Sequence, residues 1–280
     1  MTALPHHLIL EVTRHCNHRC RFCYCVWHEF PEFARRDLGT AAWKRIVTEA
    51  VAQGVDSFLF TGGEAMLRKD IRTLLDHARA LLPRGEIALF TNGSRLTEEW
   101  LKYLKRRRIR VSTSLPGLRT YAELTGTRRS FRPLLRKIAL AAEMGWPLDV
   151  SIAVNRINLA EAEELFVAAA LSRAKSIQMG AVMAEGRVRN DLELMLTPAE
   201  WAEVKRRIRA LPDCRVPYSF SDEFYCRCRE YPVAWVERFG ADRSPCPAGK
   251  TFGVIGPGGK FRKCLHTVEE TPWRHRLAAP

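Results

Sequence analysis

The chain has 280 residues, which is enough to bury one α/β core together with a small appended unit. No apolar run approaches the roughly 18 residues of a membrane-spanning helix, and no basic stretch followed by an apolar one opens the sequence. We therefore expect neither a membrane span nor a signal peptide. The net charge of +14 is compatible with an acidic partner, but no aromatic residues interleave the basic run 105–108, which argues against nucleic acid.

Apolar, strand-like runs alternate with helical patterns through the first 182 residues. The strands are expected at 8–12, 57–61, 87–91, 109–114, 148–154 and 176–182. The helices are expected at 40–52, 68–82, from about 97, at 131–144 and at 159–170. Such repeated β–α units predict an α/β fold with a parallel sheet, and six of them favour an open, partial (β/α)6 barrel. Polar and glycine-rich segments follow several strands, at the edge where parallel α/β folds place their active sites.

The pattern changes after Arg187. The segment Thr197-Pro198-Ala199-Glu200 combines an N-cap threonine, proline at the first helical position and glutamate three residues after the cap. A helix is therefore expected from there to about Leu211, and the remainder is expected to be mostly irregular. We predict a barrel domain over residues 1–190 and a small domain over residues 191–280.

Cysteines 16, 20 and 23 carry the strongest chemical signal, because their C-x3-C-x2-C spacing leaves an iron–sulfur cluster one ligand short. A 4Fe–4S cluster is normally held by four thiolates, so three on one loop leave an iron open for a substrate or cofactor. Nine cysteines without an export signal favour reduced metal ligands and a cytoplasmic location. A zinc site or buried apolar thiols are the alternatives. Cys25 lies outside the motif and is expected to be a small buried residue, with a minor functional role near the cluster as the alternative.

The loop from Cys16 to Cys23, with the aromatic Phe22 before its last cysteine, resembles the defining motif of the radical S-adenosylmethionine (SAM) superfamily. The resemblance extends from residue 8 to about residue 187. Gly62-Gly63-Glu64 resembles that family's GGE element, which meets the amino group of the cofactor's methionine. The resemblance also assigns Phe22 to the cofactor site. It places Asn92 and Ser114 where family members contact the cofactor's carboxylate or ribose.

This resemblance implies a reaction. SAM binds the open iron, and one electron from the reduced cluster cleaves it to methionine and a 5′-deoxyadenosyl radical, which abstracts hydrogen from a substrate. A flavodoxin or ferredoxin-type protein is the implied electron donor. No acid–base residue is singled out by the sequence, so catalytic residues beyond the cluster ligands stay unknown.

The C-terminal cysteines resemble the start of the SPASM/twitch extensions of the same superfamily. Cys246-Pro-Ala-Gly precedes an expected hairpin at 252–261, which turns on residues 256–259 and is followed by Cys264. The resemblance implies an auxiliary 4Fe–4S cluster that accepts the electron left on a substrate radical. Its implied ligands are four of the five later cysteines: Cys226, Cys228, Cys246 and Cys264. Cys214 and His266 are reserve candidates, and a zinc ion held by the same four cysteines is the alternative.

Relatives with such extensions often modify ribosomally made peptides by crosslinking, epimerisation or oxidation. We therefore expect a peptide substrate. The first strand begins within about eight residues, so recognition of a peptide is expected to use a separate protein or the mouth of the barrel. The alternatives are a small-molecule dehydrogenase or cofactor-biosynthesis enzyme, and a non-enzymatic iron–sulfur electron carrier. A carrier would have no use for an open iron beside GGE.

Overall fold

A single curved sheet runs through the computed structural model, which describes residues 4–33, 36–212, 215–224, 231–239, 246–268 and 270–272. Its strand order is β10-β9-β8-β1-β2-β3-β4-β5-β6-β7. The first six strands are β1 (His7–Glu11), β2 (Ser57–Thr61), β3 (Glu86–Thr91), β4 (Arg110–Ser114), β5 (Asp149–Val154) and β6 (Ser176–Ala181). They follow one another in sequence order and pair in parallel, which confirms the predicted partial barrel.

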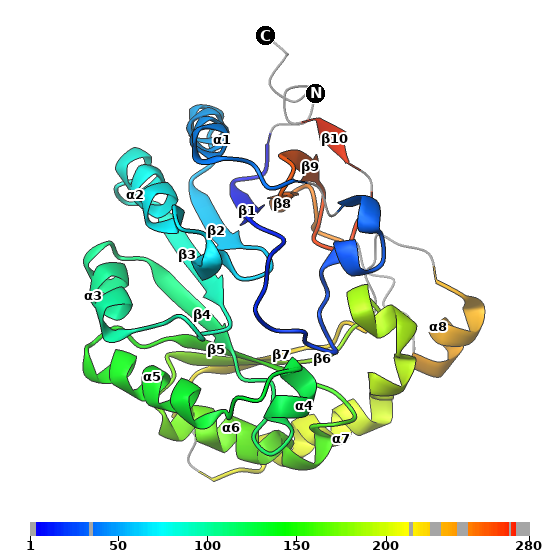
Figure 1. Ribbon diagram of the computed structural model, residues 1–280. Coiled ribbons are helices and arrows are strands. Elements are labelled where there is room, and N and C mark those ends of the chain that lie inside the picture. Colours follow the sequence, from blue (N-terminus) through cyan, green and yellow to red (C-terminus); the bar gives the residue numbers. More distant parts are fainter. Residues whose placement is uncertain are drawn as a thin grey trace.

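One long helix lies between each pair of consecutive strands from β1 to β6, and Figure 1 shows these helices on the outer side of the curved sheet. They are α1 (Thr40–Ala52), α2 (Ile71–Leu81), α3 (Glu98–Arg106), α5 (Arg132–Glu143) and α6 (Ala162–Leu171). A short helix, α4 (Tyr121–Thr125), was not predicted. Among the described residues, no helix combines the length and apolar character needed to cross a bilayer.

Helix α2 begins at Ile71, three residues later than predicted. The guanidinium of Arg68 donates to the Asp70 carboxylate (2.7 Å) and to the carbonyl oxygens of Val12 (2.7 Å) and Leu38 (3.0 Å). These bonds join the start of α2 to the chain that leaves β1. Periodicity placed Arg68 in the helix, but its side chain instead bonds to backbone segments far away in sequence.

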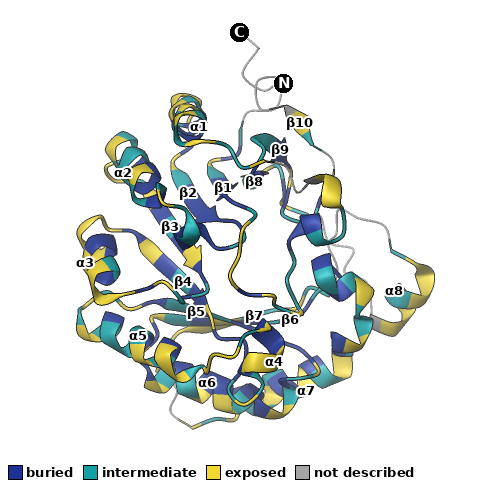
Figure 2. Ribbon diagram, viewed as in Figure 1, coloured by how far each residue is buried: buried dark blue, intermediate teal, exposed yellow. Residues whose placement is uncertain are grey.

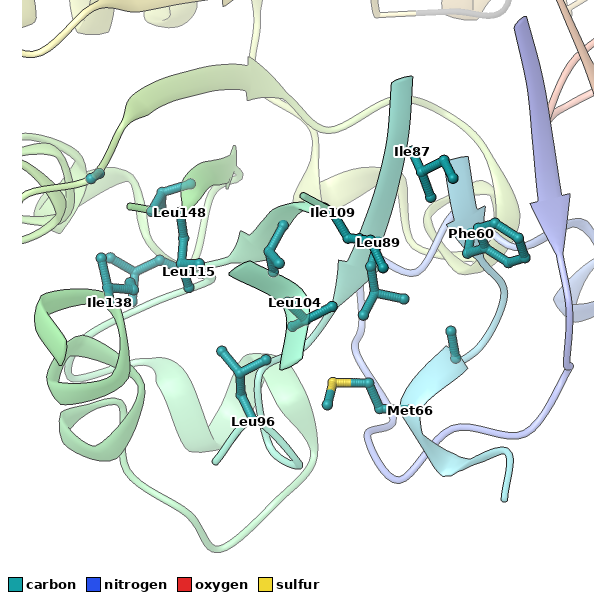
Figure 3. Close-up of a cluster of buried hydrophobic side chains, with 14 of the residues drawn as sticks. Phe60, Met66, Ile87, Leu89, Leu96, Leu104, Ile109, Leu115, Ile138 and Leu148 are labelled. Atoms are coloured by element: carbon teal, nitrogen blue, oxygen red, sulfur yellow. The ribbon is translucent and has the colours of Figure 1, made fainter. Parts of the chain in front are cut away.

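The main hydrophobic core lies between the sheet and the outer helices. Leu8, Leu10, Phe58 and Phe60 alternate along β1 and β2 and are fully buried on this side. Figure 3 shows the same layer further along the sheet, where Leu89, Leu104 and Ile138 gather between strands and helices. Figure 2 shows dark, buried strands framed by helices with exposed outer faces. Burial of this apolar surface is the main force that stabilises the barrel.

The region after residue 190 extends both ends of the sheet. Helix α7 (Pro198–Arg209) has the predicted capping box, with reciprocal bonds between Thr197 and Glu200. Strand β7 (Tyr218–Ser221) and helix α8 (Val233–Phe239) show that the expectation of irregular structure was wrong there. Strand β7 was missed because a four-residue, half-exposed run gives little periodic signal. β7 pairs in parallel with β6.

The predicted hairpin is confirmed as β8 (Phe252–Ile255) and the antiparallel β9 (Lys260–Arg262), with β10 (Thr271–Pro272) beyond it. β8 pairs in parallel with β1, so the sheet is continuous across residue 190. The division into domains at that residue stays a prediction.

An ion pair inside the protein links the hairpin to the barrel. Arg262 on β9 and Glu11 on β1 are 1% and 0% exposed, and the guanidinium donates to the Glu11 carboxylate. Arg262 also donates to the carbonyl oxygen of Leu265 (3.0 Å). Burial raises the pKa of Glu11, and the neighbouring guanidinium opposes that rise. A buried charge is tolerated only when it is paired, so the two side chains depend on each other.

Candidate functional site

The cysteine loop leaves β1 and meets the GGE loop at the carboxyl edge of the sheet. The backbone N–H of Gly63 donates to the Thr13 carbonyl (2.7 Å), and that of Glu64 donates to the His15 carbonyl (2.7 Å). Gly62 has a φ of +140°, and a Cβ atom there would lie 2.3 Å from the Thr13 oxygen. A Cβ at Gly63 would lie 2.4 Å from the His15 oxygen. Both glycines are therefore required by the close approach of two backbones.

The carboxylate of Glu64 joins the GGE loop to the end of β3. It is 1% exposed and accepts bonds from the Thr91 hydroxyl (2.8 Å), the Asn92 N–H (2.6 Å) and the Met66 N–H (3.0 Å). Burial raises the pKa of Glu64, and these hydrogen bonds oppose the rise. The side chain thus fixes the loop that carries Asn92, while contact with a methionine amino group stays a prediction.

Asn92 lies against the cysteine loop. Its Nδ2 donates to the Oδ1 of Asn17 (2.9 Å) and lies 3.9 Å from the Cys16 Sγ. Asn17 in turn donates to the Ser94 hydroxyl (2.9 Å). The structure thus brings Asn92 and Glu64 to the first cysteine, and it adds Asn17, which the sequence reading missed. Ser114 is exposed at the end of β4, on the same edge of the sheet.

Two further contacts hold the cysteine loop and were not predicted. The N–H groups of Arg19 and Arg21 donate to the carbonyls of Thr125 (2.8 Å) and Leu124 (2.9 Å), at the end of α4. On another side, the Arg187 N–H donates to the Cys23 carbonyl (2.9 Å).

Gly186, beside Arg187, makes the second of these contacts possible. It has a φ of +56°, and a Cβ there would lie 2.2 Å from the Cys23 oxygen. The sequence shows only an isolated glycine after the sixth strand. It does not show that this glycine contacts Cys23, which lies far away in sequence.

The electrostatics of the loop fit a metal cluster. Burial raises the pKa of the Cys16 thiol, and it raises the pKa of Cys20 to about 12. The nearby Cys23 raises both pKa values further. The pKa of Cys23 itself is lowered, first by a hydrogen bond from Cys25. Cys16 is exposed and Cys20 and Cys23 are half-buried. As thiolates the three would require a positive counter-charge, which the iron of a cluster would supply.

Within the described parts of the chain, no three His, Cys, Asp or Glu side chains are grouped around one point, so the cluster ligands and the zinc alternative both stay predictions. Phe22, which precedes Cys23, packs against the apolar cluster of Val182, Val188 and Leu194. Its predicted contact with the cofactor stays a prediction.

The C-terminal cysteines form a second group. Cys264, 4% exposed, and Cys246 belong to one apolar cluster beside the start of β8, together with Phe252. The predicted ligands Cys226 and Cys228, and the reserve Cys214, lie outside the described residues. The auxiliary ligand set therefore stays a prediction.

His266 connects this group to the cysteine loop. Its backbone N–H donates to the Cys264 Sγ (3.2 Å). Its ring meets the ring of Tyr24 edge-on, with 5.8 Å between centroids. Tyr24 directly follows Cys23. The contact between the Tyr24 and His266 rings therefore connects the cysteine loop with the C-terminal cysteines.

Comparison with known proteins agrees with this geometry. The family model described as the Radical SAM superfamily matches residues 10–168. The sporulation killing factor maturation protein SkfB of Bacillus subtilis is 27% identical over 66% of this chain and 44% of its own length. Fe-coproporphyrin III synthase of Methanosarcina barkeri is 30% identical over 57% of this chain and 39% of its own. The chain thus spans less than half the length of these two relatives.

A relative with wider coverage is the PqqA peptide cyclase of Bradyrhizobium diazoefficiens, 26% identical over 95% of this chain and 68% of its own. Among solved structures, Streptococcus suis SuiB bound to its precursor peptide SuiA has a TM-score of 0.72. That match has 17% identity and covers 95% of this chain and 60% of SuiB. At this identity the likeness concerns the fold.

Proposed function

Because the chain belongs to the radical SAM superfamily, we propose that it cleaves SAM reductively and uses the resulting radical to modify a peptide. One observation carries the proposal: the cysteine loop, the GGE loop and Asn92 meet at one edge of a parallel sheet. That edge is where α/β folds of this kind bind ligands. When bound, a 4Fe–4S cluster and SAM supply one-electron cleavage of the sulfonium and a 5′-deoxyadenosyl radical.

The residues of this chain have defined tasks in the proposed reaction. Cys16, Cys20 and Cys23 hold three irons, and the GGE backbone keeps their loop in place. The amide of Asn92, partly exposed beside Cys16, presents a polar group to the cofactor. The exposed hydroxyl of Ser114 presents another from β4. A zwitterionic amino acid needs such donors and acceptors close to the metal that it chelates.

A peptide substrate is supported by the relatives. PqqA peptide cyclase aligns with nearly the whole chain, including the region after residue 190. SkfB is a maturation protein, and SuiB, which shares the fold, binds a precursor peptide. We therefore place this chain among peptide-modifying enzymes, with a separate recognition protein and a flavodoxin or ferredoxin-type reductant as its partners.

A second cluster is part of the proposal. Cys246 and Cys264 already lie in one apolar cluster, and Cys226 and Cys228 would complete a set of four. Full ligation by four thiolates suits electron transfer better than substrate binding, because no iron stays open. Such a cluster would supply an acceptor, within the same chain, for the electron left on the substrate radical.

Anaerobic reconstitution tests the assignment. The full chain should bind about eight irons if both clusters form, and about four if only the first does. With SAM and dithionite it should form 5′-deoxyadenosine, and Cys16→Ala should abolish that product. Gln53→Leu, at an exposed position after α1, is the control and should keep both iron and product. Failure of the reconstituted protein to form any 5′-deoxyadenosine would overturn the proposal.

A small-molecule substrate is the second candidate, because Fe-coproporphyrin III synthase is also similar to this chain. That alignment covers 57% of this chain, whereas the peptide cyclase covers 95%. The wider coverage favours the peptide.

A further inference from the structure

A cavity of about 280 Å³ lies on the concave face of the sheet, opposite the outer helices. Its walls are strand residues whose neighbours along the chain face the hydrophobic core. The sequence patterns singled out none of these concave residues. A ligand pocket typically combines an apolar surface with a few polar groups that converge on it.

One wall of the cavity is apolar. Leu59 on β2 and Ala88 and Phe90 on β3 line it. Phe90 is 40% exposed, and it lines the cavity instead of packing against an outer helix. An aromatic side chain left exposed at a concave surface offers a flat face to a ligand.

The strands from β4 to β7 add polar, uncharged residues to the lining. They include Ser112 on β4, Gln178 on β6 and Ser219 on β7. Gln178 is the register partner of Ser219, and Phe90 is that of Ser112. Within the part of the chain that the structure describes, these three polar side chains make no hydrogen bond to protein. Their donors and acceptors are therefore available to a ligand.

The charged residues at the amino-terminal end of the cavity are already engaged. Arg110 pairs with Glu86 and with Asp149 (3.0 Å), and the Ser176 hydroxyl donates to Asp149 (2.6 Å). Two carboxylates thus face one guanidinium. His7 adds no positive charge near neutral pH, because burial lowers its pKa. An anionic ligand would meet net repulsion there.

The cavity lies next to the predicted cofactor contacts. Ser112 and Ser114 are two residues apart on β4, so they share a face and are separated by about 6.6 Å along the strand. Phe90 directly precedes Thr91, whose hydroxyl holds Glu64. A group seated between Phe90 and Gln178 would therefore lie just below a cofactor held at the strand ends.

We infer that this cavity receives one side chain of the substrate, an aromatic one that carries an uncharged hydrogen-bonding end, such as a phenol. The flat body lies on Phe90, Ala88 and Leu59, and the polar end reaches Ser112, Gln178 or Ser219. The inference rests on the proposed function for its claim that the occupant is part of a substrate. It adds a site and a class of side chain to that function.

Capped amino acids test the inference directly. Ligand-observed NMR titrations of the reconstituted full chain should rank N-acetyl-tyrosinamide above N-acetyl-phenylalaninamide and N-acetyl-glutaminamide, each by about five-fold, the usual effect of one hydrogen bond or one ring contact. Capped glutamate should bind more weakly still. Tighter binding of capped glutamate or capped lysine than of the tyrosine probe would overturn the assignment.

Three variants test whether the tyrosine probe binds in this cavity. Phe90→Ala and Gln178→Leu should each weaken the tyrosine probe about five-fold, and both positions are exposed enough to keep the fold. Gln53→Leu, at an exposed position after α1, is the matched control and should change nothing. Equal binding in all three variants would overturn the inference. Formation of 5′-deoxyadenosine in the same preparation separates failure of the cavity from failure of the proposed function.

Discussion

The cysteine loop at residues 16–23 and the C-terminal pair Cys246–Cys264 are held in place in different ways. The first is a short loop whose thiols are close in sequence and whose backbone bonds to the GGE loop, to α4 and to the segment at Gly186. The second depends on a hairpin that pairs with β1 and on a buried ion pair between residues 251 apart. A group of thiols can thus be held by local spacing or by the tertiary position of a hairpin.

The largest expected effect comes from breaking the link between the two regions. Arg262→Met should leave Glu11 charged and unpaired in the core, and lower the free energy of unfolding by about 3–5 kcal/mol. Urea denaturation of the single variants and of Glu11→Leu/Arg262→Met measures the coupling. The double variant should recover most of the loss. A loss below about 1 kcal/mol for Arg262→Met would show that the hairpin does not depend on the pair.

A substitution that leaves all three cysteines in place should still disrupt the cysteine loop. Gly62→Ala places a methyl group 2.3 Å from the Thr13 carbonyl at a φ of +140°, which should destabilise the protein by about 1–3 kcal/mol. If both proposed clusters form, iron should fall from about eight to about four per chain, because Gly62 supports only the first. Gly39→Ala is the control, since nothing lies within 4 Å of its Cβ position. Loss of all iron in Gly62→Ala would contradict independent support of the two sites.

A milder change tests the region after residue 190 alone. Thr197→Ala removes the capping box of α7 and should cost about 1 kcal/mol in thermal or urea unfolding. Iron content and 5′-deoxyadenosine formation should not change, because α7 covers the sheet from outside. A fall in iron would show that α7 supports a cluster.

The smallest effect concerns acid sensitivity at β1, which lies between the two regions. Burial holds the pKa of His7 below its ordinary value of 6.5, although Glu86 and Asp56 oppose this. The folded state therefore binds this proton less readily than the unfolded one. The stability contributed by His7 is present above pH 6.5 and is lost as the pH falls through the lowered pKa. His7→Gln should flatten the stability profile in that interval, and an unchanged profile would contradict the prediction.

Local patterns in the sequence were sufficient for much of the barrel. The six strands, the helix at 40–52 and the capping box at Thr197 follow from periodicity and from residues a few positions apart. The approach of the GGE glycines to the chain after β1 agrees with the resemblance to radical SAM enzymes. Strand β7 was missed because its run of four residues is too short and too exposed to give a periodic signal. The cavity at Phe90 was missed because its lining comes from strands far apart in sequence.

What the sequence determined by itself is the alternation of strands and helices, the spacing of Cys16, Cys20 and Cys23, and membership of a family. These are properties of short segments, where backbone geometry and side-chain chemistry act over a few residues. The tertiary structure decided that β8 pairs with β1, that Arg262 meets Glu11 and that Gly186 contacts Cys23. Such contacts form only when the whole chain buries its core, so no local pattern contains them.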